Sequence, residues 1–150
     1  MRAAAVYQLK DRIFVYPLQQ TTEGLGLASE PYVSLPLDAE PESLGNAVLS
    51  ALSQSGKTVP HPTSWKGFDK PRLEAAGVKS QAAFHAGARS ISVERDEVLR
   101  LEPSRNGGSK RKTKGFTPLP ELSMSLPLSA NAETLGQAIR ACLARCIASD

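Results

Sequence analysis

The sequence has few of the features that mark membrane-spanning, secreted or metal-binding proteins. It has 150 residues with only two cysteines and two histidines. No apolar run approaches the ~20 residues that a membrane-spanning helix needs. The apolar start, residues 3–6, is too short for the core of a signal peptide. We therefore expect one cytoplasmic domain over residues 1–150, long enough to bury a core of its own.

The cysteines and histidines offer little for redox, metal or acid–base chemistry. Cys142 and Cys146 are four residues apart on one expected helix face, where a disulfide between them is geometrically unfavourable. Free thiols in a reducing compartment are the simpler interpretation. His61 and His85 are not at metal-ligand spacing from each other, from a cysteine or from a carboxylate. We expect no catalytic residue, no metal and no cofactor.

Charge is unevenly distributed along the chain, although the net charge is only +3. Lysine and arginine are absent between Arg12 and Lys57. That stretch carries five acids: Glu23, Glu30, Asp38, Glu40 and Glu42. The opposite charge gathers later in the chain, at Arg105, Lys110, Arg111, Lys112 and Lys114. This basic run is either a solvated loop or a contact for an acidic partner or nucleic acid. Because only Phe116 follows it, aromatic stacking adds little support for nucleic acid.

The sequence contains an internal repeat. Residues 34–52 and 125–143 align without a gap and are identical at 10 of 19 positions. Upstream, residues 6–16 and 91–101 share a pattern of strand, charged turn and strand. The sequence pattern of each half therefore predicts three strands followed by a helix. The repeat predicts that the two halves are related by an approximate twofold axis.

These patterns predict an α+β fold with an internally duplicated architecture. Two β-β-β-α halves, about residues 1–55 and 89–150, are expected to share an antiparallel or mixed sheet. Residues 17–30 and 103–117 are expected to be equivalent loops. The helices should begin near Glu40 and Asn131. Gly45 and Gly136 lie inside the two helices, which predicts a close approach of each helix to the sheet.

The central connection, residues 56–88, belongs to neither half. Its sequence predicts a polar loop followed by two helices, near residues 71–76 and 80–88. Gly77 is expected to end the helix near 71–76. Trp65, the only tryptophan, lies in this loop next to Phe68. Trp65 either anchors the loop onto the sheet or is an exposed anchor for a partner.

Several short motifs, taken in order, resemble the contact-dependent growth inhibition (CDI) immunity proteins. The resemblance covers nearly the whole chain, through residues 21–26, 32–37, 44–45, 61–67, 74–80, 105–108 and 115–116. One departure is residues 110–114, a segment longer and more basic than the family pattern. The resemblance implies a cytoplasmic binding protein and not an enzyme. Its partner would be the C-terminal domain of a toxin delivered by a neighbouring cell, commonly a nuclease that attacks RNA.

Such an inhibitor would bind its toxin one to one and cover the active site or the substrate groove. A nuclease groove is positive, so a negative inhibitor surface gains affinity and association rate. The candidate contact residues are Glu23, Glu30, Tyr32, Asp38, Glu40, Glu42 and Trp65, with the basic residues Arg105, Lys110, Arg111 and Lys112 as a further group. Nucleic acid would be contacted only through the toxin.

Two other functions remain open from the residues alone. An RNA-binding module using residues 105–114 predicts salt-dependent affinity for RNA. A small-molecule enzyme built around His61, Thr63 and Arg105 predicts a deep polar pocket where the central loop meets the segment around Arg105.

Overall fold

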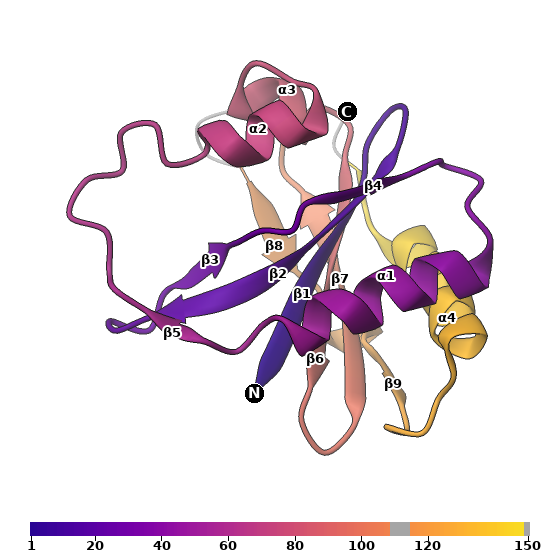
Figure 1. The fold of residues 1–150 in the computed structure, drawn as a ribbon. Helices are drawn as coiled ribbons and strands as arrows, with labels where there is room; N and C mark the ends of the chain where they lie inside the picture. Colours follow the sequence, from indigo (N-terminus) through magenta and orange to yellow (C-terminus); the bar gives the residue numbers. More distant parts are fainter. Residues whose placement is uncertain (109–114, 149–150) are drawn as a thin grey trace.

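The computed structural model describes residues 1–108 and 115–148. Within these residues nine strands form one curled, mainly antiparallel sheet, which four α-helices accompany (Figure 1). The fold is therefore mixed α and β, as predicted. The elements are β1 (Arg2–Gln8), β2 (Ile13–Thr21), β3 (Gly26–Ala28), β4 (Val33–Leu35), α1 (Pro41–Ser53), β5 (Thr58–Val59), α2 (Lys70–Ala76), α3 (Gln81–His85), β6 (Arg89–Arg95), β7 (Leu99–Asn106), β8 (Phe116–Pro118), the 3-10 turn η1 (Pro120–Leu122), β9 (Met124–Leu126) and α4 (Ala132–Arg145).

Two hairpins, β1–β2 and β6–β7, lie side by side in the sheet. Its strand order is β3-β2-β1-β6-β7-β8, with β4 added to β2 and β9 added to β7. β1 and β6 meet in the middle, where Val6 pairs with Ile91. All pairs are antiparallel except β2 with β5. β4 and β9 end just before Pro36 and Pro127, so both prolines lie where the missing N–H costs no hydrogen bond of the sheet.

Within residues 1–108 and 115–148, each half has four strands and not the predicted three. The expected loops 17–30 and 103–117 contain β3 and β8, and β2 and β7 extend into them. The polar ends of β2 and β7 are buried because their side chains are hydrogen-bonded. Gln19 donates to the Ser29 hydroxyl and the Gln54 carbonyl and accepts from the Lys57 amide. Asn106 donates to the carbonyls of His85 and Ala88.

The main core lies between the sheet and the helices α1 and α4, which cover one sheet face (Figure 1). The apolar side chains along one face of each of these two helices are buried there. The largest fully buried side chains of the helices are Leu44, Leu52, Leu135, Ile139 and Leu143, and those of the facing strands are Ile13, Ile91, Leu99 and Leu101. No helix within the described ranges combines the length and the apolar character needed to cross a membrane.

The two helix glycines face the other helix and not the sheet, so that prediction was wrong. A Cβ atom added to Gly45 would lie 1.8 Å from the carbonyl oxygen of Ala132. One added to Gly136 would lie 1.8 Å from the carbonyl oxygen of Pro41. The first turns of α1 and α4 therefore touch through backbone atoms, which only glycine permits.

The opposite face of the sheet carries an aromatic cluster beneath α2 and α3. Phe14, Tyr16 and Phe84 are buried in it, with Tyr7 and Tyr32 packed against them. α2 matches the predicted helix and ends at Gly77, whose φ of 75° is left-handed. α3 stops at His85 and is shorter than the predicted 80–88.

The start of α4 was predicted correctly, but its end was not. Asn131 caps its first turn by accepting a hydrogen bond from the Thr134 amide at 2.8 Å. Cys142 and Cys146 are free and buried, as expected. Cys146, however, is not on the helix face, because α4 ends at Arg145 and the Cys146 backbone is extended.

Candidate functional site

Four of the five predicted acidic contact residues lie at the two ends of β2. Glu23 is in the β2–β3 turn, whereas Asp38, Glu40 and Glu42 lie in the β4–α1 connection and the first turn of α1. A strand rises about 3.3 Å per residue, so the two ends of β2 are roughly 26 Å apart. Figure 1 shows the β2–β3 turn and the β4–α1 connection on opposite sides of the molecule. The acidic residues therefore form two groups and not one surface.

Glu23 is held by a histidine of the central connection. The Nε2 atom of His61 lies 3.4 Å from Oε2 of Glu23, and its Nδ1 lies 3.0 Å from Oγ1 of Thr21. The buried Thr21 hydroxyl already accepts the backbone N–H groups of Glu23 and Leu25. It is therefore free to donate its own proton to Nδ1, which places the ring proton on Nε2, facing the carboxylate. The sequence offered no signal for this pairing.

Trp65 packs on the same histidine. Its ring lies edge-on to His61 at a centroid distance of 5.6 Å, and to Phe68 at 5.1 Å. Trp65 remains 48% exposed, so it is not a plug that anchors the loop onto the sheet. We call Thr21, Glu23, His61, Trp65 and Phe68 the Trp65 cluster. In this cluster two of the predicted contact residues, Glu23 and Trp65, both contact His61. His61 was not among the predicted contact residues.

The second acidic group surrounds the start of α1. Asp38, Glu40 and Glu42 are all exposed. The connection that carries them is fixed by Arg140 of α4, which donates to the Leu37 carbonyl at 2.7 Å and the Ala39 carbonyl at 2.6 Å. Glu42, in the first turn, also favours the positive end of the helix.

The remaining predicted contacts are dispersed. Glu30 is exposed in the β3–β4 connection. Tyr32 stacks on Phe14 with a ring distance of 5.9 Å, and its burial raises the pKa of the phenol. Tyr32 is thus part of the aromatic cluster. Arg105 is exposed but lies in β7, opposite Thr117 of β8, and not in a loop. Lys110, Arg111 and Lys112 lie outside the described residues.

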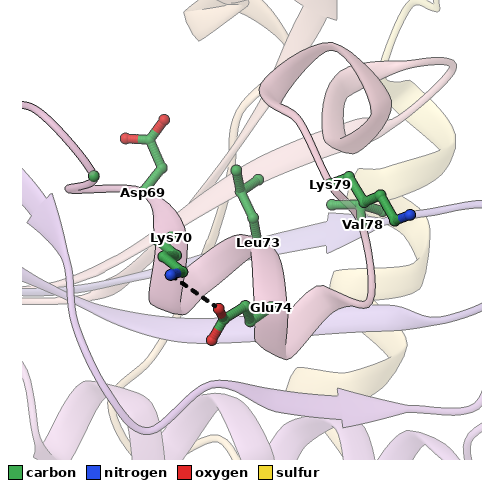
Figure 2. A pocket seen from close by; sticks show the side chains of 7 residues that line it. Asp69, Lys70, Leu73, Glu74, Val78 and Lys79 are labelled. Carbon is green, nitrogen blue, oxygen red and sulfur yellow. Dashed lines mark ion pairs between the residues drawn. The ribbon is translucent and has the colours of Figure 1, made fainter.

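One surface pocket lies beside α2. It has a volume of about 440 Å³ and is lined by residues between Gly67 and Lys79. Figure 2 shows its apolar side chains, Leu73 and Val78, together with the ion pair of Lys70 and Glu74. Its lining does not include any predicted contact residue.

A second pocket, of about 210 Å³, crosses the sheet face that carries the aromatic cluster, between Tyr7, Tyr16, Ser92 and Phe116. Neither pocket is lined by His61, Thr63 or Arg105, which the enzyme interpretation would require.

Neither the cysteines nor the metal-ligating side chain types of the described residues are arranged as a reactive or metal-binding group. Burial raises the pKa of the Cys142 thiol to about 12, so it stays a neutral thiol at physiological pH. Residues 1–108 and 115–148 contain no group of three or more histidine, cysteine or acidic side chains placed to hold a metal ion. The feature that stands out is instead an exposed tryptophan beside an acid on two ordered loops.

The fold is shared with two solved structures. A protein of unknown function from Neisseria meningitidis superposes with a TM-score of 0.72 at 21% sequence identity, covering 97% of this chain and 94% of that one. The CdiA-CT/CdiI toxin and immunity complex from Yersinia pseudotuberculosis contains a chain that superposes with a TM-score of 0.75 at 17% identity, covering 97% of both chains. No curated protein sequence matches.

The sequence also matches a defined family. Residues 61–146 match the family described as CDI immunity protein, CdiI. This segment runs from His61 of the Trp65 cluster to the end of α4. Because the match spans more than half of the sequence, the chain belongs to the CDI immunity protein family.

Proposed function

We propose that this protein is an immunity protein that binds and neutralises the C-terminal toxin domain of a CDI system in the cytoplasm. The observation that carries the proposal is the family match over residues 61–146. Inhibition needs no catalysis: one immunity protein covers the active site or the substrate groove of one toxin domain. We further propose that the toxin is a nuclease that acts on RNA.

The distribution of charge supports this mode of inhibition. A nuclease has a cationic groove for phosphates, and an acidic partner gains association rate and correct orientation from it. This chain has no lysine or arginine between Arg12 and Lys57, although its net charge is +3. The exposed acids of that stretch, at both ends of β2, are therefore available to meet a basic partner.

The test is an inhibition assay with the toxin domain encoded upstream of this gene. We expect a one-to-one complex and a loss of RNA cleavage that is complete at one equivalent of the protein. Full toxin activity at saturating protein would overturn the proposal. A control measures RNA affinity of the protein alone across salt concentrations, because phosphate contacts make such affinity steeply salt-dependent. RNA binding without toxin binding would favour the RNA-binding alternative.

We also infer that the two halves are an internal duplication. The pairing of Ile13 with Leu35 in the first half corresponds to that of Leu99 with Leu126 in the second. The two reciprocal glycine contacts between α1 and α4 also join equivalent positions of the 19-residue repeat, because Gly45 corresponds to Gly136 and Pro41 to Ala132. These observations support a twofold relation between the half-repeats 1–55 and 89–150.

A further inference from the structure

We propose that the Trp65 cluster is the surface on which the toxin is seated, and that His61 is the positioning residue that holds Trp65 ready for it. This inference rests on the proposed function and goes further, because it selects one end of β2 and assigns a role to a residue outside the acidic stretch.

After Met1, the two most exposed large apolar side chains of the described residues lie at this end of the molecule. Trp65 is 48% exposed and Leu25 is 45% exposed, although both are large apolar side chains. Leu25 lies in the β2–β3 turn, and its amide bonds to Thr21, which in turn contacts His61. Tryptophan, with tyrosine and arginine, is enriched among the residues that contribute most to binding at protein interfaces. Exposure of this kind on two adjoining loops is typical of a binding surface.

His61 connects the tryptophan to the sheet. The central connection pairs with β2 only up to Val59, whose carbonyl accepts from the Thr22 amide at 3.0 Å. Beyond β5 the chain arcs away from the sheet before it reaches α2 (Figure 1). Within that arc, His61 contacts the buried Thr21 of β2 on one side and the Trp65 ring on the other. The Trp65 ring also contacts Phe68, but Phe68 belongs to the same loop and not to the sheet.

The chemistry of the cluster selects a cationic partner group. The indole face attracts a guanidinium or ammonium group, and the nearby Glu23 carboxylate can pair with the same cation. The Glu23 side chain is 69% exposed and thus accessible to a partner. We infer that an arginine or lysine from the basic groove of the toxin stacks on Trp65 and pairs with Glu23.

The single tryptophan makes a direct test available. The protein is labelled with 5-fluorotryptophan, so that it gives one ¹⁹F resonance, and is titrated with unlabelled toxin domain. We expect this resonance to shift and to lose its sensitivity to solvent as the complex forms. Trp65→Ala should weaken binding about 30-fold, mainly through faster dissociation. Val98→Ala is the matched control, because Val98 is an exposed apolar residue of the β6–β7 turn and not part of the Trp65 cluster, and it should bind like the wild type.

His61→Ala should act differently from Trp65→Ala. If His61 only positions the ring, its loss lowers the fraction of molecules ready to bind, which weakens binding about fivefold through slower association. In the free protein, acrylamide should then quench Trp65 fluorescence more strongly. His61→Gln retains a donor and an acceptor and should recover part of the affinity. The thermal unfolding midpoint of each variant shows whether the fold is intact.

The outcomes separate this inference from the proposed function. Tight toxin binding with an unmoved ¹⁹F resonance and no effect of Trp65→Ala overturns the inference and leaves the proposed function standing. An effect of His61→Ala without any effect of Trp65→Ala also overturns it, because His61 would then be only structural. Absence of toxin binding by the folded wild-type protein overturns the proposed function itself.

Discussion

Gly45 of α1 lies against the backbone of Ala132 at the start of α4, closer than any side chain would allow. An added Cβ atom would be 1.8 Å from the Ala132 carbonyl oxygen, and the neighbouring atoms are backbone and cannot move aside cheaply. The same relationship joins Gly136 to Pro41. Two helices from opposite halves of the chain are thus held together at their first turns.

Gly45→Ala should therefore destabilise the protein, although alanine normally favours a helix over glycine by about 1 kcal/mol. The added methyl group would push α1 and α4 apart, and such overpacking of a well-packed core costs about 3 kcal/mol or more. Urea unfolding followed by circular dichroism measures the change, and Gly136→Ala should behave alike. Gly26→Ala is the control, because a Cβ atom there meets nothing within 4 Å. Equal stability of Gly45→Ala and the control would contradict the close helix contact.

Arg140→Met should loosen the acidic connection before α1. Arg140 supplies two hydrogen bonds to the Leu37 and Ala39 carbonyls, and charged donors of this kind contribute about 1–2 kcal/mol when partly exposed. We expect a loss of stability in that range and faster amide hydrogen exchange at residues 37–40. Arg95→Met, at an exposed position of β6, should change neither. Unchanged exchange in Arg140→Met would show that the tether contributes little in solution.

Reversing the charge of the group at α1 should slow toxin association. The double variant Glu40→Lys and Glu42→Lys replaces two exposed acids by bases, and steering by surface charge acts on the association rate. We expect association to be about tenfold slower at low salt, with a smaller difference at high salt. Surface plasmon resonance at two ionic strengths measures it. The double variant Asp96→Lys and Glu97→Lys, in the β6–β7 turn, changes the net charge by the same amount and is the control. If it slows association equally, the effect depends on the net charge of the protein and not on the position of the acids before α1.

Alkaline pH should destabilise the fold through Cys142. Burial raises the pKa of this thiol to about 12, compared with 9.0 for an ordinary cysteine. Below pH 9 both the folded and the unfolded chain carry the neutral thiol, so this group adds no pH dependence. Above pH 9 only the unfolded chain ionises, and the free energy of unfolding falls as the pH rises towards 12. Unfolding in urea at pH 7, 8.5 and 10 should show this decline, and Cys142→Ala should show less of it.

The sequence predicted much of the scaffold because the repeat and the apolar periodicity are local patterns. The start of α1 after Glu40, the Asn131 cap and the Gly77 helix end were confirmed for that reason. The polar ends of β2 and β7 were mistaken for loops, since burial of Gln19 depends on partners far away in the chain. The Trp65 cluster was also out of reach, because Glu23 and His61 are 38 residues apart and meet only in the folded sheet.

The reciprocal glycine contacts of α1 and α4 have the geometry of a subunit interface inside one chain. Each helix offers a notch at its glycine and a carbonyl that fills the notch of the other. In an isologous dimer the two subunits contact each other through the same surface patch. If residue i of one subunit contacts residue j of the other, then residue j of the first also contacts residue i of the second. Here the central connection tethers the two patches covalently, so that their encounter does not depend on protein concentration. The tether also leaves the two halves free to diverge in charge: residues 1–55 have six acidic and three basic residues, whereas residues 89–150 have seven acidic and ten basic residues.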